Sequence, residues 1–147
     1  MNAKLFNTPF ESSLRIVILL SIIGKPCDID YITAIDFITL YGNFFSVTDT
    51  NINGKNSRFL GEYSARRVSI KNGIKNLIMN GLLKLKIDSN KLMYFVSEEG
   101  ITFCDSLVSD YALNYKNNVV KTINHTMNLN NEQILKLVIQ GNNSNEQ

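Results

Sequence analysis

The sequence predicts a mainly α-helical fold with one small β-hairpin. Apolar residues recur at helical spacing over most of the 147 residues, and a Gly follows each of the first three helical stretches. A single short segment instead alternates apolar and charged residues, which is typical of a strand with one buried face. Hydrophobic residues make up 44% of the chain, enough for a globular domain with a core of its own.

Two apolar helices open the chain. Thr8 and Glu11 form a capping box around Pro9, which favours the first position of a helix. The apolar stripe of this helix consists of Phe10, Leu14, Val17, Ile18, Leu19, Leu20, Ile22 and Ile23. The second helix begins after a cap at Asp28 and runs to Tyr41. Because it is apolar on nearly every side, we expect it to be the most buried element.

A long polar stretch separates these helices from a basic one. Residues 43–61 show no sustained periodicity, and a loop of this length is uncommon inside a compact domain. Helical spacing returns from Tyr63 to Asn80, and Gly81 ends that helix. We expect Gly73 to weaken the helix or to break it near its middle.

The next segment predicts a hairpin. Residues 83–87 alternate Leu or Ile with Lys, residues 88–91 form a turn, and residues 92–96 return as a second strand. Ser97 caps a further helix, which we expect to continue toward Met127. Its buried face should consist of Ile101, Cys104, Leu107, Val108 and Tyr111. We expect a short amphipathic helix at 132–139 and a disordered polar tail from Gly141.

The order of helix, helix, basic helix, hairpin and helix is that of a winged helix-turn-helix. We expect residues 1–127 to form this domain, with an extended final helix, and residues 128–147 to form a C-terminal helical extension with a disordered tail. The twenty-residue gap before the third helix departs from the short turn usual in this fold. The standard geometry of docking on DNA therefore does not follow from the element order alone.

Positive charge is concentrated in one part of the chain. Nine basic residues between Lys55 and Lys91 stand against two acidic ones, whereas the whole chain carries only +2. This asymmetry indicates a polyanion or an acidic protein surface as a partner, although solvated helix and hairpin faces account for the same charges. The candidate binding residues are Arg66, Arg67, Lys71, Lys75, Lys84, Lys86 and Lys91.

The residue inventory predicts that the chain is not an enzyme and holds no metal or cofactor. His125 is the only histidine, and Cys27 and Cys104 lie far apart in the sequence, so no metal-ligand spacing and no nucleophile with a base is visible. No phosphate-binding loop or dinucleotide fingerprint occurs. A carboxylate metal site would have to use Asp28, Asp30 and Asp36, and helix capping already accounts for the first two.

The amino terminus lacks the apolar stretch of a signal peptide, and the apolar run at 16–23 is too short to span a bilayer. We therefore expect a cytoplasmic protein with no membrane partner.

The opening stretch KLFNTPFESSLRIVILLSIIG resembles the start of the middle-component subunits of ABC-three-component systems, a group that overlaps Lamassu-type antiphage defence. The matching residues are Phe6, Asn7, Thr8, Pro9, Glu11, Leu14 and Arg15. Residues 34–38 are similar to a second family motif, and residues 67–83 to its Arg-rich helix and the segment after it. The resemblance covers about residues 4–115.

This resemblance implies a non-catalytic accessory subunit that couples an SMC-like ABC ATPase, which senses foreign DNA, to an effector such as a nuclease. Helix capping explains part of the opening motif but does not explain Phe6, Asn7 or Arg15. Phe6, Asn7, Pro9, Glu11 and Arg15 are therefore candidate partner-binding residues, which either dock on the ATPase or lock the amino-terminal arm against the final helix. The alternative is a free-standing dimeric winged-helix transcription regulator whose partner is double-stranded DNA.

Overall fold

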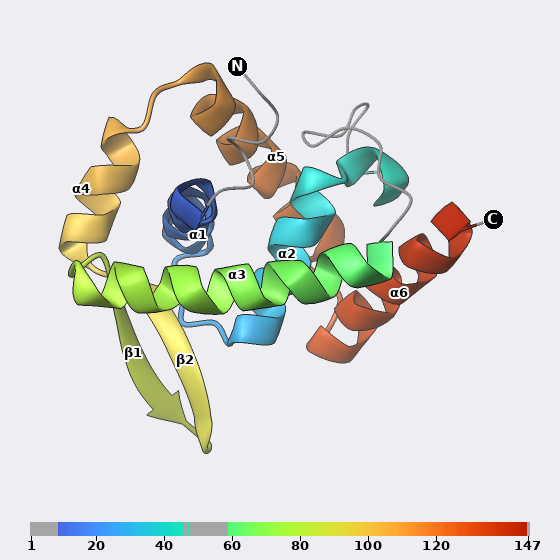
Figure 1. Cartoon of the computed structure of the whole chain (residues 1–147), viewed down its shortest axis with the longest axis horizontal. Coiled ribbons are helices and arrows are strands. Elements are labelled where there is room, and N and C mark those ends of the chain that lie inside the picture. The colour runs from blue at the N-terminus through green and yellow to red at the C-terminus, as the bar shows by residue number, and fades with distance from the viewer. Residues whose placement is uncertain (1–8, 46, 48–58, 147) are drawn as a thin grey trace.

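The computed structural model describes residues 9–45, 47 and 59–146, and every structural statement below concerns these residues. This part of the chain is mainly helical and contains a two-stranded antiparallel sheet (Figure 1). The elements are α1 (Pro9–Ile23), α2 (Ile29–Leu40), the 3-10 turn η2 (Gly42–Phe45), α3 (Phe59–Met79), β1 (Leu83–Asp88), β2 (Lys91–Val96), α4 (Glu98–Ser106), α5 (Asp110–Thr126) and α6 (Asn131–Glu146).

Helices α1 and α2 form the centre of the core. Every residue from Ile16 to Leu20 in α1 and from Ile32 to Leu40 in α2 is buried, as the apolar composition of both helices predicts. The predicted cap of α2 is confirmed, because the Asp28 carboxylate accepts a hydrogen bond of 2.8 Å from the Tyr31 amide. Helix α3 crosses the other two, and α5 packs against them as well (Figure 1).

Helix α3 is continuous through Gly73, so the predicted weakening does not break it. A Cβ atom at this position would lie 3.0 Å from Cδ1 of Ile16 and 3.3 Å from Oγ of Ser13, both on α1. Glycine thus permits the close approach of α1 and α3, which is a packing reason for its place in this helix despite its poor helical propensity. The helix begins at Phe59, earlier than the predicted Tyr63.

The predicted hairpin is present, but most of it projects beyond the helices (Figure 1). Its turn residues Ser89 and Asn90 both have positive φ, 52° and 68°, as a tight two-residue hairpin turn requires. Only Leu83, at the base of the expected apolar face, is buried, whereas Leu85 is 48% and Ile87 70% exposed. The expectation of a fully covered face is therefore wrong.

Two contacts fix the base of the hairpin to the helices. The backbone of Tyr94 in β2 exchanges hydrogen bonds of 2.8 and 2.9 Å with the backbone of Cys27, directly before α2. Directly after β2, Ser97 donates a 2.6 Å hydrogen bond to the Gly81 carbonyl and accepts one of 3.0 Å from the Gly100 amide. Gly100 lies directly against the Leu82 carbonyl, so the start of α4 is held close to the end of α3.

The single helix expected from Ser97 toward Met127 is divided into α4 and α5. Ser109 caps α5 by accepting a hydrogen bond from the Ala112 amide. Lys116 of α5 reaches back and donates to the carbonyls of Cys104 and Leu107, at 2.9 and 2.8 Å, which satisfies the end of α4. Of the predicted buried face, Cys104 is buried, Leu107 and Tyr111 are partly buried, and Ile101 and Val108 are exposed.

The carboxyl-terminal part also differs from the prediction. Helix α6 extends to Glu146, beyond the predicted end near Ile139. Ile134 and Val138 of α6 are buried in the same core as α1 and α2. None of the helices described here combines the length and the apolar character needed to cross a membrane.

Candidate functional site

A buried polar network joins α1, α2 and α5. Arg15 Nε donates a 3.0 Å hydrogen bond to Asp36 Oδ1, and the Tyr115 hydroxyl donates a 2.6 Å bond to the same oxygen. Two weaker contacts, at 3.3 and 3.4 Å, link the guanidinium to Ser12 and to the Tyr111 hydroxyl. Arg15 and Asp36 are both almost fully buried, so the network belongs to the core.

The protonation states of this network follow from its contacts. Burial alone would lower the pKa of Arg15, but the Asp36 carboxylate, with Tyr111 and Tyr115, outweighs burial and raises that pKa above its ordinary value. Burial and the nearby Asp36 charge raise the pKa of Tyr115 well above its ordinary value. Arg15 therefore stays charged and Tyr115 stays neutral, which is the combination that satisfies Asp36.

This network contains two residues that the sequence analysis named, and it corrects the expectation for one of them, Arg15. Arg15, a candidate partner-binding residue, is only 1% exposed and cannot contact a partner in this fold. Asp36, the third acid of the carboxylate set considered for a metal, is bound by Arg15 and Tyr115 instead. Over the described ranges, no three His, Cys, Asp or Glu side chains are grouped so as to hold a metal ion.

The structure covers the rest of the opening motif only in part. Pro9 is the first residue of α1, in agreement with the sequence prediction. Glu11 is partly buried, and burial raises the pKa of its carboxyl group while the nearby Arg15 charge opposes this shift. Phe6, Asn7 and the capping residue Thr8 lie outside the described residues.

The basic residues of α3 lie on two different faces. Arg67, Lys71 and Lys75 share one exposed face, as their spacing predicts. Arg66 is instead buried, at 6% exposure, with its guanidinium carbon 5.8 Å from the centre of the Tyr41 ring. Arg66, a candidate binding residue, is therefore not part of the exposed basic face.

The hairpin lysines do not extend the α3 face into one surface. Leu85 pairs with Tyr94 and Ile87 with Leu92 across the two strands, so these side chains occupy one face of the hairpin. Lys84 and Lys86 alternate with them and occupy the other face. Since Leu92 and Tyr94 border α3, these two lysines point away from the α3 cations.

A cleft of about 410 Å³ lies between the hairpin tip, α3 and the start of α2. We call it the hairpin cleft; its lining consists of Asp28, Ile29, Asp30, Arg67, Lys71, Asn90, Lys91, Leu92 and Tyr94. Arg67 Nε lies 2.9 Å from Asp30 Oδ1, and Lys91 Nζ lies 3.7 Å from Asp28 Oδ2. The cleft is thus of mixed charge with apolar patches, rather than uniformly basic.

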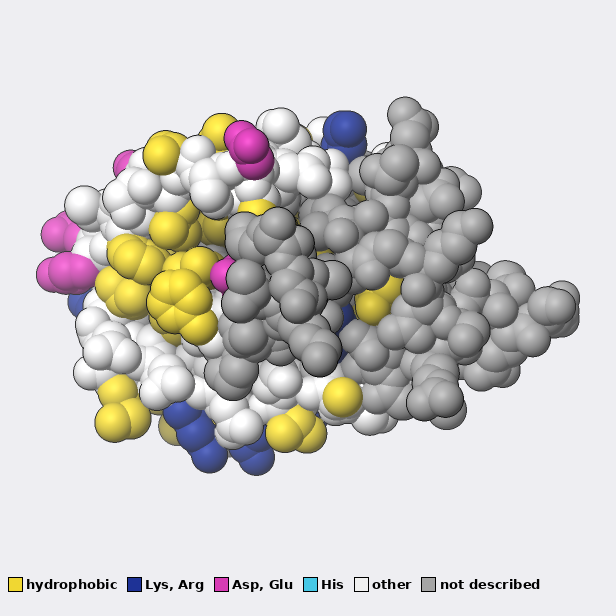
Figure 2. All heavy atoms as spheres, turned by 45° about the horizontal axis from the view of Figure 1, so that its top comes forward, with side chains coloured by type: hydrophobic (Ala, Val, Ile, Leu, Met, Phe, Trp, Pro, Cys, Tyr) yellow, Lys and Arg dark blue, Asp and Glu magenta, His cyan; other side chains and the backbone are white. Residues whose placement is uncertain are grey.

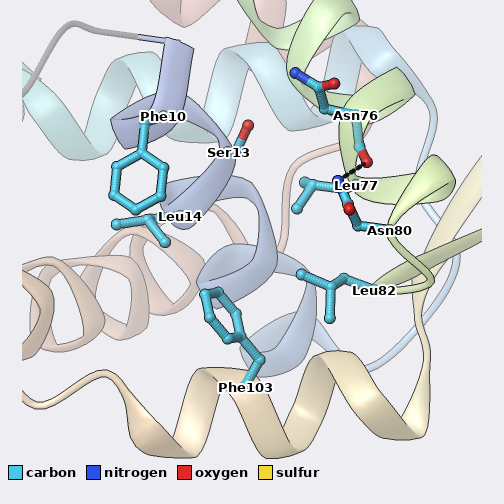
Figure 3. Close-up of a pocket in the computed structure, with 8 residues that line it drawn as sticks. All are labelled: Phe10, Ser13, Leu14, Asn76, Leu77, Asn80, Leu82 and Phe103. Carbon is cyan, nitrogen blue, oxygen red and sulfur yellow. Dashed lines mark hydrogen bonds between the residues drawn. The ribbon is translucent and has the colours of Figure 1, made fainter.

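A second hollow lies between α1, α3 and α4 (Figure 3). This apolar groove has a volume of about 350 Å³ and is lined by Phe10, Ser13, Leu14, Asn76, Leu77, Asn80, Leu82 and Phe103. Phe10, which lies at the edge of the groove, is 67% exposed. Figure 2 shows hydrophobic side chains gathered at the surface between α3 and α4, with acidic side chains beside them.

One comparison with known proteins identifies the family. Residues 5–146 match the family described as ABC-three component (ABC-3C) system Middle Component 2. The chain belongs to this family. The match includes the residues that line both hollows. It also includes α6 of this middle component, which lies beyond the range of about residues 4–115 that the sequence motifs cover. No curated protein and no solved structure matches the middle component.

The two hollows of this middle component lie on opposite sides of α3. Arg67 and Lys71 face the hairpin cleft, whereas Asn76 and Asn80 face the apolar groove. At about 100° per residue these pairs are about half a turn apart around the helix axis. One rigid helix therefore separates a mixed-charge surface from an apolar one.

The sequence analysis missed both the burial of Arg66 and the apolar groove. For Arg66, a signal of burial was present. Arg66 stands four residues before Ile70 and eight before Ile74, so the spacing that marks the buried stripe of α3 includes it. No comparable pattern marks the groove, because Leu14, Leu77 and Phe103 come from three helices that are far apart in the sequence.

Proposed function

We propose that this middle component is a non-catalytic winged-helix adaptor, which couples an SMC-like ABC ATPase that senses foreign DNA to an effector such as a nuclease in Lamassu-type antiphage defence. The family supports a place in an ABC system. The order α1, α2, α3, hairpin and α4 supports the winged-helix assignment. The observation that carries the adaptor role is the pair of hollows of unlike chemistry on opposite sides of α3.

The apolar groove is the proposed site for the ATPase. The motif Phe6–Arg15 is the part of the chain that resembles other middle components most specifically. It contains Phe10 and Leu14, which line the groove. An ABC partner is also the one that the family as a whole implies. An apolar segment of the ATPase would fit the groove.

The hairpin cleft is the proposed site for the effector. Exposed Leu92 and Ile87 provide apolar contact area, and the paired charges around them suit a protein surface that carries both signs. These features do not favour the alternative of a free-standing transcription regulator, because a duplex would meet Asp28 and Asp30 together with the cations.

A catalytic role finds little support in the described residues. Asp36 is held by Arg15 and Tyr115 in the core, and Asp28 caps α2. We expect the purified chain to have no nuclease, ATPase or hydrolase activity. Metal-dependent DNA cleavage that is lost in an Asp30→Asn variant would make the chain an effector instead.

The test is co-purification of the tagged chain with the ATPase and effector encoded beside it. Phe10→Asp should remove the ATPase and keep the effector, because it places a charge in the groove. The triple variant R67E/K71E/K75E should remove the effector and keep the ATPase. Val120→Asp, at a 46% exposed position on α5 outside both hollows, is the matched control and should retain both partners.

Two outcomes would contradict the adaptor role. One is retention of both partners by the groove and cleft variants alike. The other is a wild-type chain that purifies alone as a symmetric dimer with sequence-specific, salt-sensitive affinity for DNA, which is the behaviour of a transcription regulator.

A further inference from the structure

The acidic residues at the start of α2 face the cations of α3 and of the hairpin tip. Asp30 and its partner Arg67 are 55% and 45% exposed at the side chain, and Lys91, the partner of Asp28, is 67% exposed. Ion pairs this accessible to water contribute little to stability. Their main effect is on the electrostatic potential of the hairpin cleft, and hence on what the cleft binds.

We propose that Asp28 and Asp30 keep double-stranded nucleic acid off the hairpin cleft and reserve this surface for a protein. The proposal rests on the adaptor function above and specifies the partner class of one of its two surfaces. It depends on the acidic and basic side chains that are paired in the cleft, and not on the shape of the cleft.

The physical argument starts from how a basic surface binds DNA. Affinity comes from cations that contact phosphates and release counterions. A phosphate that reached Arg67 or Lys91 would also lie close to a carboxylate, because the two ion pairs span 2.9 and 3.7 Å. A phosphate in contact with either cation would therefore lie within the Debye length of about 8 Å from the paired carboxylate at physiological salt, so salt does not remove the repulsion between them. Each Asp therefore offsets one cation of the cleft.

The hairpin does not compensate for this loss. Lys84 and Lys86 lie on the hairpin face that points away from the cleft. Apart from Lys91, which is paired with Asp28, the hairpin side chains that line the cleft are Asn90, Leu92 and Tyr94, and none of these offers a cation to a phosphate. Lys71 remains as the cleft cation with no carboxylate at ion-pair distance among the described residues.

The test compares three forms of the full chain: wild type, D28N/D30N and E98Q/E99Q. Asn is as good a helix cap as Asp, so the first variant should keep the fold. The second variant changes the net charge equally, at the start of α4 and outside the cleft, and is the matched control. Thermal melts followed by circular dichroism verify that all three are folded.

Binding of a short fluorescent DNA duplex is measured by anisotropy between about 50 and 200 mM salt. We expect D28N/D30N to bind about tenfold more tightly than wild type at the low-salt end, with a salt dependence steeper by about two phosphate contacts. E98Q/E99Q should behave as wild type.

Three results would each overturn the proposal. In the first, wild type binds the duplex as tightly as D28N/D30N; in the second, the control gains affinity equally; in the third, none of the three forms binds the duplex. Failure of the adaptor function shows in a different measurement, the absence of ATPase and effector from the wild-type co-purification. The two ideas therefore fail separately.

Discussion

Arg15 of α1 and Asp36 of α2 form an ion pair inside the core, with 3.0 Å between Nε and Oδ1 and side-chain exposures of 1% and 2%. Tyr115 of α5 donates to the same carboxylate, so three helices that are distant in the sequence meet at one charged group. A buried pair of this kind is costly to break from one side, because the remaining charge has no water to solvate it.

Removal of one partner of this pair should destabilise the fold strongly. Asp36→Ala leaves the Arg15 guanidinium buried beside neutral groups, and we expect a loss of about 3–5 kcal/mol in the free energy of unfolding. Urea denaturation measures this loss. The double variant R15M/D36L removes both charges and should cost less than the sum of its single changes. If Arg15→Met has the same urea midpoint as wild type but no longer co-purifies with one of the partners, Arg15 is a binding residue and the prediction is wrong.

The close packing of α1 on α3 predicts a specific compensation. Gly73→Ala adds a Cβ 3.0 Å from Cδ1 of Ile16, while it gains about 1 kcal/mol in helical propensity. Ile16→Val removes this Cδ1 atom. Gly73→Ala should therefore be more favourable in the Ile16→Val background than in wild type. A double-mutant cycle of urea midpoints tests this, and additive effects would show that the contact does not limit the approach.

Gly100 should tolerate substitution less well than Gly73. A Cβ at Gly100 would collide with the carbonyl oxygen of Leu82 and with Cγ2 of Val96. A backbone carbonyl cannot rotate away as a side chain can, so the contact between α4 and the end of α3 must open. We expect Gly100→Ala to lower the melting temperature more than Gly73→Ala does. A smaller effect at Gly100 would mean that the start of α4 shifts easily.

The chain should lose stability in alkali. Burial raises the pKa of the Cys27 thiol to about 12 from 9.0, against a lowering by Lys25. A raised pKa in the folded state gives stability that is complete below about pH 9 and is lost as the pH rises toward 12. The raised pKa of Tyr115 adds a loss above about pH 10.

Urea midpoints measured at several pH values check this prediction. Cys27→Val should remove the part of the decline that begins near pH 9. It should leave the part above about pH 10, to which burial of Tyr115, Tyr111, Tyr63 and Tyr31 contributes by raising their pKa values. An unchanged pH profile in Cys27→Val would show that the thiol does not cause the early loss.

Local patterns predicted the elements whose causes are local. The Asp28 cap, the start of α1 at Pro9 and the hairpin strands all depend on residues within one or two turns. The continuity of α3 at Gly73 depends on Ile16, far away in the sequence, and helical propensity alone could not show it. The break between α4 and α5 depends in part on Lys116, which caps α4 only because α5 folds back.

The candidate site was harder to predict than the fold. Residue type suggested that Arg15 and Arg66 lie at the surface, and both are buried because each has a partner on another helix. The exposed face of Arg67, Lys71 and Lys75 followed from helical periodicity. The ion pair between Arg67 and Asp30 could not follow from periodicity, since Asp30 reaches Arg67 only after α2 and α3 have packed.

The hydrogen bonds between Cys27 and Tyr94 bear on how fast this protein meets its partners. They attach the hairpin to the segment that enters α2, so the cleft walls hold their relative positions before any encounter. A partner then docks on a preformed surface and need not wait for a slow rearrangement. Association at this face should therefore show a single kinetic phase, whose observed rate rises linearly with partner concentration. Diffusion and the orientation of the two surfaces set the association rate constant.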